Sequence, residues 1–242
     1  MPRRRPALLA ASLLLAPPLC AAQEIIHAMY SERPPYMAAQ PDGSPAGLTG
    51  TPAANAFRHA GVAVEWLRLP TNRQLLRLKD PHALNCAIGW FNVPERTAYS
   101  KLTRPIYRDH GWVALSNARF AARAYTSLDE LMRHPEVRLL VKDNYSYGGL
   151  DPLIQRWRPT IAVSTGSTLK MVQSVGAGLV DLMFITEDES QYILRHQAGE
   201  YGANLRVLRF KDMPHGSERH ILCSKAVPDE VIDRLNKAIT FR

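Results

Sequence analysis

Short apolar runs alternate with amphipathic segments through most of the chain. The runs that indicate strands cover residues 24–30, 62–69, 86–89, 103–107, 112–115, 137–141, 161–163, 180–185, 205–210 and 220–223. The amphipathic segments that indicate helices cover residues 51–60, 72–79, 127–133, 150–156, 168–177, 187–196 and 229–239. Strands that alternate with helices are typical of a mostly parallel sheet whose faces are covered by helices. The sequence therefore predicts an α/β fold with two such halves.

Ligands of open α/β sheets bind beyond the carboxyl ends of the strands. One such end lies in the stretch 85–107, where Gly89 allows close approach of a ligand to the backbone. The next two residues, Trp90 and Phe91, offer an apolar wall. Arg96 follows in a Pro-Glu-Arg turn and offers a planar guanidinium that can hold a carboxylate through two hydrogen bonds. The stretch predicts a site for a small anionic or zwitterionic solute. The alternative for Arg96 is a surface position or an ion pair with Glu95.

Residues 1–22 have the layout of a secretory signal peptide. A basic start at residues 3–5 precedes an apolar run at residues 7–16 and a small-residue exit that ends at Ala22. The run is too short to span a bilayer. We expect cleavage after Ala22 and export of the remaining chain to the periplasm. A lipid anchor on Cys20 is the alternative.

Composition and charge narrow the function classes. Of the 242 residues, 46% are hydrophobic and 21% are charged, which is ordinary for a globular protein. Without the leader arginines, the formal charge falls from +8 to +5, and the charges are scattered, which argues against nucleic-acid binding. The histidines and cysteines lack metal-ligand spacing, and no catalytic or dinucleotide fingerprint occurs, so we expect neither a metal nor a cofactor.

Five motifs occur in an order that is similar to a known family. They are ERPPYM at residues 32–37, DGSPAGLTG at 42–50, PER at 94–96, TRPIY at 103–107 and VSTGSTLKMVQSVGAGLVDLMF at 163–184. Together they resemble the periplasmic solute-binding proteins of amino-acid ABC transporters, the bacterial extracellular solute-binding protein family 3. The resemblance implies the type II periplasmic-binding fold, a two-lobed clamshell in which two crossover strands join the lobes. Each lobe would hold a mostly parallel sheet flanked by helices.

The resemblance also implies how the chain divides. After the signal peptide at residues 1–22, residues 23–108 and 212–242 would form the first lobe, and residues 109–211 would form the second. The hinge would lie at residues 107–111 and 211–216. Ligand would be held between the lobes, which would close on it.

Arg96 matches the family's carboxylate-binding arginine, so the resemblance makes it the ligand anchor. The family usually has serine or threonine before this arginine, whereas this chain has Gly89, Trp90 and Phe91. The family's aspartate that binds the α-ammonium group falls near Thr186, and the neighbouring Glu187 is the candidate substitute. The alternative for Glu187 is the first turn of a helix, where an acid is favourable in any protein.

The second lobe of the family usually offers a turn rich in glycine and hydroxyl residues. In this chain Tyr145 and Ser146 occupy that place, and the Ser146 hydroxyl with nearby backbone amides is the candidate contact. Tyr36 follows the first strand, where its ring either stacks on ligand or packs in the core.

Cys86 and Cys223 both fall in strands of the first lobe that are neighbours in this fold. The resemblance therefore allows a disulfide between them, which would suit an oxidising compartment. Two buried free thiols are the alternative.

We expect a monomer that delivers an amino acid-like solute to an inner-membrane ABC permease, or that reports it to a receptor. The remaining alternative is an enzyme of the cyclohexadienyl-dehydratase type, with Glu187 as its general acid.

Overall fold

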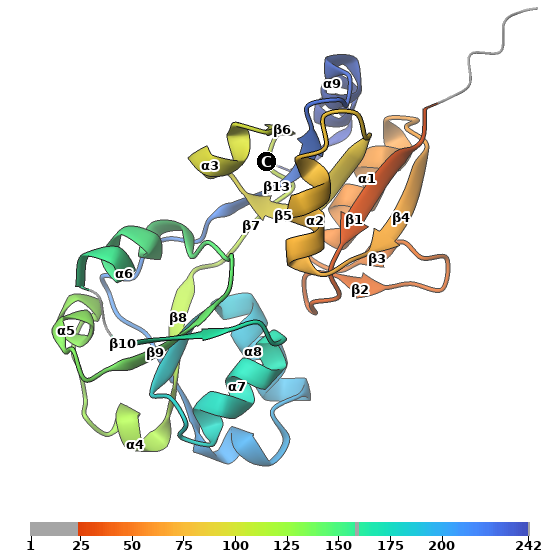
Figure 1. The fold of residues 1–242 in the computed structure, drawn as a ribbon. Helices are drawn as coiled ribbons and strands as arrows, with labels where there is room; N and C mark the ends of the chain where they lie inside the picture. The colour runs from red at the N-terminus through yellow and green to blue at the C-terminus, as the bar shows by residue number, and fades with distance from the viewer. Residues whose placement is uncertain (1–23, 158–159, 242) are drawn as a thin grey trace, which may run out of the picture.

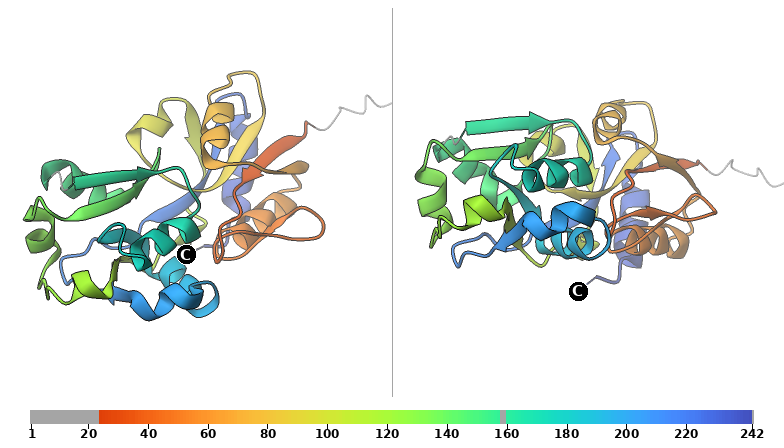
Figure 2. Two further views of the ribbon diagram at one scale, coloured as in Figure 1. Left: turned by 60° about the horizontal axis from the view of Figure 1, so that its bottom comes forward. Right: turned by 90° about the horizontal axis from the view of Figure 1, so that it is seen from below.

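The computed structural model describes residues 24–157 and 160–241 and shows two lobes, each built around one sheet (Figure 1). The predicted signal peptide at residues 1–22 lies outside the described residues. Two further views keep the two sheets in separate lobes (Figure 2). No helix in the described part of the chain is long and apolar enough to cross a membrane.

The first lobe has the strand order β4-β1-β5-β13-β6, with β7 paired to β13. Its strands are β1 (Ile26–Tyr30), β4 (Val64–Arg68), β5 (Asn85–Phe91), β6 (Ser100–Leu102), β7 (Tyr107–Arg108) and β13 (Glu218–Ser224), and a small hairpin holds β2 (Ala38–Ala39) and β3 (Pro45–Ala46). Its helices are α1 (Gly50–His59), α2 (Thr71–Leu78), α3 (Pro94–Thr97) and α9 (Asp229–Ala238).

The second lobe has the strand order β10-β9-β11-β8-β12. Its strands are β8 (Trp112–Asn117), β9 (Arg138–Lys142), β10 (Thr160–Ser164), β11 (Leu182–Thr186) and β12 (Leu205–Leu208). Its helices are α4 (Ala118–Ala121), α5 (Leu128–Arg133), α6 (Asp151–Trp157), α7 (Thr168–Gly176) and α8 (Glu187–His196), with 3-10 turns η1 (Gly148–Leu150) and η2 (Gly199–Asn204).

The sheets are mixed, where the sequence predicted mostly parallel ones. In each lobe one half is parallel, β4-β1-β5 and β10-β9-β11. The strands on the other side of each sheet, including β13 and β8, pair antiparallel. The physical reason is the route of the chain. The parallel strands of both lobes end at the cleft, and β8 and β13 each start there because each enters its lobe from the other one.

The single strand expected at residues 103–107 is wrong. The chain instead forms β6, then an irregular step, then β7, both paired with β13. Pro105 has no N–H to donate to a strand ladder, so the pairing breaks around it.

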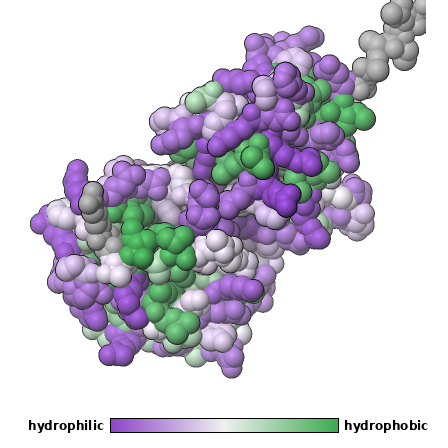
Figure 3. All heavy atoms as spheres, viewed as in Figure 1, coloured by the Kyte–Doolittle hydropathy of each residue, from purple (hydrophilic) through white to green (hydrophobic). Residues whose placement is uncertain are grey.

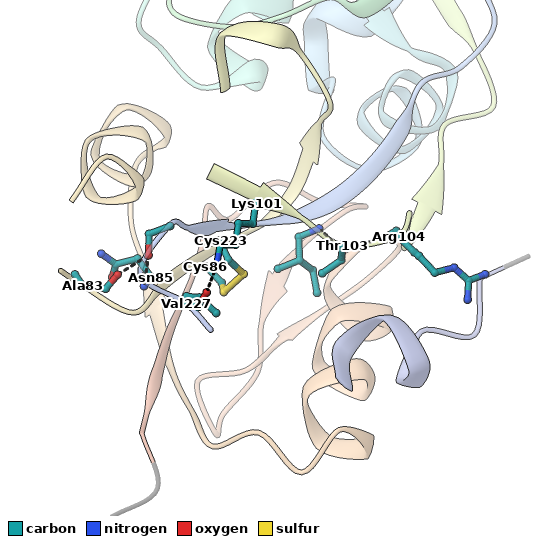
Figure 4. The surroundings of a disulfide bond; sticks show 10 residues. Ala83, Asn85, Cys86, Lys101, Thr103, Arg104, Cys223 and Val227 are labelled. Atoms are coloured by element: carbon teal, nitrogen blue, oxygen red, sulfur yellow. Dashed lines mark hydrogen bonds between the residues drawn. A yellow bond between two sulfur atoms is a disulfide. The ribbon is translucent and has the colours of Figure 1, made fainter. Parts of the chain in front are cut away.

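Cys86 and Cys223 lie opposite each other on the paired strands β5 and β13, and a disulfide joins them (Figure 4). Both are fully buried in the core of the first lobe. The bond links segments 137 residues apart, with the whole second lobe between them. The two cysteines are therefore paired, and the alternative of two buried free thiols is wrong.

Hydrophobic side chains also reach the surface of the second lobe, on the face where the edge strand β10 runs (Figure 3). Ile161 and Val163 of that strand are exposed. The remaining large hydrophobics of this lobe mostly fill two clusters, one on each side of the sheet.

Candidate ligand cleft between the lobes

A cavity of about 670 Å³ lies between the lobes and is lined by both of them. The first lobe contributes the loop after β1, the end of β5 and the arginine of α3. The second contributes the residues after β9, the start of α7 and part of α8. Seven of the eight predicted ligand residues line it, namely Tyr36, Gly89, Trp90, Phe91, Arg96, Tyr145 and Ser146.

Gly89 sits at a bulge in β5. Its neighbours Ile88 and Trp90 pair with Ile221 and His220, which are consecutive on β13, so Gly89 is the extra residue. Its φ of +78° lies in the left-handed region that favours glycine, and a Cβ there would approach the Thr49 hydroxyl to 3.1 Å. The bulge turns the end of β5 toward the cavity.

Arg219 of β13 also lines the cavity, a role that the sequence analysis missed. Its guanidinium donates to both carboxylate oxygens of Asp109, at 2.6 and 2.9 Å, and to the Gly89 carbonyl at 3.0 Å. It also lies over the rings of Tyr36 and Phe91, at 4.1 and 4.6 Å from their centroids. Its hydrogen-bonding capacity is therefore largely used inside the protein.

Arg96 differs from Arg219 in having no acidic partner. Its side chain is 8% exposed, yet no carboxylate of the described residues lies within ion-pair distance of it. Its guanidinium donates to the Phe91 carbonyl at 3.3 Å and lies 4.6 Å from the centroid of the Trp90 ring. Burial lowers the pKa of Arg96 from its ordinary value, which still leaves the group charged at neutral pH. A buried cation of this kind is stabilised by an anionic ligand.

Trp90 is fixed by a contact within the first lobe, and Phe91 is fixed by contacts with the second lobe. The Trp90 indole donates to the Gln74 amide oxygen at 3.1 Å, so its N–H is not free for ligand. Phe91 packs edge-on against Trp112 and Tyr145 of the second lobe, at centroid distances of 6.3 and 6.5 Å. These rings supply the apolar wall that the sequence predicted.

An ion pair between Arg33 and Glu189 crosses the cleft, and neither residue was among the predicted site residues. Arg33 donates to both Glu189 oxygens, at 2.6 and 2.5 Å, and to the Tyr145 hydroxyl at 3.0 Å. Burial by itself would lower the pKa of Arg33, but the charge of Glu189 and the contact with Tyr145 raise it well above its usual value. The pair ties the loop after β1 directly to α8.

Tyr36 forms a second link between the lobes. Its hydroxyl donates to the Thr186 hydroxyl at 2.7 Å, and its ring is fully buried in the core of the first lobe. Burial raises the pKa of this phenol well above its usual value, so it remains a neutral donor. Tyr36 packs in the core and also lines the cavity, and the stacking of its ring on ligand stays a prediction.

Lys142 ends β9 and lines the cavity from the second lobe. Within the described ranges its ammonium group has no hydrogen bond or ion pair to another side chain. Burial, followed by the nearby charge of Arg33, lowers its pKa from the usual value. No sequence motif pointed to Lys142, although its place at the end of a strand was a usable signal.

Ser146 lines the cavity, but its hydroxyl is engaged locally. It donates to Asp151 at 2.7 Å and accepts from the Gly148 N–H at 3.1 Å. Both bonds stabilise the turn that leads into α6.

Glu187 does not line the cavity. Arg209 donates to it at 2.5 Å, and Gln191 donates to it at 3.1 Å. The physical reason is helix phase: Thr186 caps α8, and residues two apart on a helix point in nearly opposite directions. Glu189 therefore faces the cavity, whereas Glu187 faces outward.

No group of three or more His, Cys, Asp or Glu side chains that could hold a metal ion occurs in the ranges 24–157 and 160–241.

No family model matches the sequence, and no curated protein matches it. Solved structures match closely in fold. An ancestral arginine-binding protein bound to arginine is 15% identical, with 89% of this chain and 90% of that chain covered and a TM-score of 0.69. A structure concerned with glutathione import through GshT and a cystine ABC importer of Streptococcus mutans is 11% identical, with 90% and 88% covered and a TM-score of 0.73. An ancestral amino acid-binding protein, a precursor of cyclohexadienyl dehydratase, is 15% identical, with 89% and 87% covered and a TM-score of 0.65.

These likenesses, together with the two mixed sheets and the cavity between them, define the two-lobed type II periplasmic-binding fold. The fold that the sequence motifs implied is confirmed.

Proposed function

We propose that this chain is an exported solute-binding protein that captures a small carboxylate-bearing solute between its lobes. The observation that carries the proposal is Arg96, a buried guanidinium that lines the cavity without an acidic partner in the described residues. The ligand carboxylate would supply the missing charge through two parallel hydrogen bonds. Similar folds in an arginine-binding protein and in work on an ABC importer support this class of function.

The bound solute would pass to an inner-membrane ABC permease or be reported to a receptor. The first lobe comprises residues 23–108 and 212–242, and the second comprises residues 109–211. The hinge lies in the two segments that cross between the sheets, residues 107–111 and 211–216. Closure follows if ligand binds the closed state better than the open one.

The enzyme alternative requires a carboxyl group in the cleft that is free to donate a proton to a bound substrate. Glu187, its sequence candidate, faces away and pairs with Arg209. Glu189 does line the cavity, but both of its oxygens accept from Arg33. This arrangement favours binding over catalysis.

The test is a thermal-shift screen of amino acids, polyamines and small carboxylates, performed on residues 23–242 and on the Arg96→Ala variant. We expect at least one carboxylate to raise the melting temperature of the parent chain and to lose that effect in the variant. Arg156→Ala, at an exposed position of α6 outside the cavity, is the matched control and keeps the response. A carboxylate response that Arg96→Ala leaves intact refutes the assignment of Arg96.

A further inference from the structure

The cavity is lined by more positively charged than negatively charged side chains. The cations are Arg33, Arg68, Arg96, Lys142 and Arg219, and the acids are Glu32, Asp143 and Glu189. Three of the cations already have acidic partners: Arg33 pairs with Glu189, Arg68 with Glu32 and Arg219 with Asp109. Among the described residues, Arg96 and Lys142 are the cations of the lining that have no ion pair. They lie on different lobes.

The same lining offers no free buried acid in the described part of the chain. Glu189 is 1% exposed, and Arg33 occupies both of its oxygens. Asp143 is half-buried, and one of its oxygens accepts from the amides of Asn72 and Asn144, at 3.3 and 2.9 Å. An α-ammonium group placed deep in this cavity would therefore lose its hydration without gaining a carboxylate partner, which is unfavourable.

We propose that the cleft takes a small dianion without an ammonium group, with one anionic group at Arg96 and the other at Lys142. This inference rests on the proposed function and names its ligand class. A ligand of this kind contacts both lobes through charge-assisted hydrogen bonds, so it stabilises the closed state.

The surroundings of Lys142 fit the second anionic group. The first residues of α7 line the cavity beside it, and the N-terminal end of this nine-residue helix favours an anion. Trp90 and Phe91 line the same cavity and supply an apolar wall for the body of the ligand. A dicarboxylate with a short hydrocarbon body has this combination of groups.

The experiment is isothermal titration calorimetry on residues 23–242 with matched pairs of ligands. Succinate, glutarate and adipate are each compared with the 2-amino acid of the same length, namely aspartate, glutamate and 2-aminoadipate. We expect at least one dicarboxylate to bind about ten-fold or more tightly than its amino counterpart, because only the latter carries an ammonium group that must be desolvated. An amino counterpart that binds equally or more tightly overturns the inference.

Two variants test the residue assignments. Lys142→Gln is expected to weaken dicarboxylate binding about ten-fold or more, while the Kd of the matching monocarboxylate changes by no more than about two-fold.

Arg33→Gln frees the Glu189 carboxylate. The ratio of the Kd of the dicarboxylate to the Kd of its amino counterpart is therefore expected to move about five-fold or more in favour of the amino counterpart. The ratio is insensitive to any change in the free energy of closing, because that change affects both ligands. Arg209→Gln, which breaks the pair with Glu187 outside the cavity, is the control and leaves the ratio unchanged.

The outcomes separate the two proposals. If amino acids bind tightly and this binding depends on Arg96, the proposed function is supported and the proposal of a dianionic ligand is refuted. A dicarboxylate response that Lys142→Gln does not weaken also overturns it. If none of these ligands and no compound of the screen binds, both the ligand class and the proposed function fail.

Discussion

Two buried arginines in this protein have opposite surroundings. Arg219 is neutralised within the fold by Asp109, whereas Arg96 packs against Trp90 and has no acidic partner in the described residues. The first arrangement holds the structure together, because removing one member of a buried pair leaves the other charge uncompensated. The second leaves a desolvated charge directed to the cavity, which is unfavourable until an anion binds.

Replacing each of the two arginines is therefore expected to change stability to a different extent. Arg219→Gln is expected to lower the free energy of unfolding by about 3–5 kcal/mol, because Asp109 then lacks its partner. Arg96→Gln is expected to change it by less than about 1 kcal/mol, since no ion pair is broken. For ligand binding, Arg96→Gln costs about 2 kcal/mol or more, which is roughly 30-fold in Kd.

Denaturant unfolding and calorimetry measure both effects. A loss of stability in Arg96→Gln that matches the loss in Arg219→Gln would show that Arg96 has a structural role and not a ligand role.

At the scale of elements, β5 and β13 carry most of what the first lobe gives to the cleft. Gly89 and its bulge direct the end of β5, and Arg219 on β13 reaches back to the Gly89 carbonyl. The disulfide between Cys86 and Cys223 joins the same two strands a few residues from the cleft (Figure 4). The bond thus anchors the returning chain segment to the first half of the lobe.

Loss of this disulfide is expected to destabilise the protein. In the double variant Cys86→Ala with Cys223→Ala, the free energy of unfolding falls by about 2–5 kcal/mol, because a long loop of the unfolded chain is no longer closed. Alkylation followed by mass measurement provides the companion test on residues 23–242. Unreduced protein takes up no label and reduced protein takes up two. Two labelled thiols without reduction would contradict the bond.

At the scale of the whole molecule, the lobes are joined by direct contacts as well as by the crossing segments. Arg33 pairs with Glu189, and Tyr36 donates to Thr186, in each case from the first lobe to the second. Both contacts join protein groups across the cleft, so they stabilise the closed arrangement of the lobes.

We predict that Arg33→Gln opens the unliganded protein. Without the bidentate pair across the cleft, the closed state loses a charge-assisted contact, so the open state becomes more populated and the radius of gyration in solution scattering increases. Arg209→Gln breaks the Arg209–Glu187 pair, which lies within the second lobe, and leaves the radius unchanged. Equal radii for Arg33→Gln and the parent chain would show that the pair does not hold the lobes together.

The sequence by itself determined the α/β class, the order of most strands and helices, and the strand-end stretch from Gly89 to Arg96. Those features depend on local periodicity and on residue types close together in the chain.

Only the tertiary structure decided what surrounds each site residue. Arg33 and Glu189 are 156 residues apart, so no local pattern joins them. Helix phase, which the three consecutive acids of α8 do not reveal, turned Glu189 inward and Glu187 outward. Charge balance in a cavity is a property of folded neighbours, and for that reason the free cations Arg96 and Lys142 became visible together only once both lobes were in place.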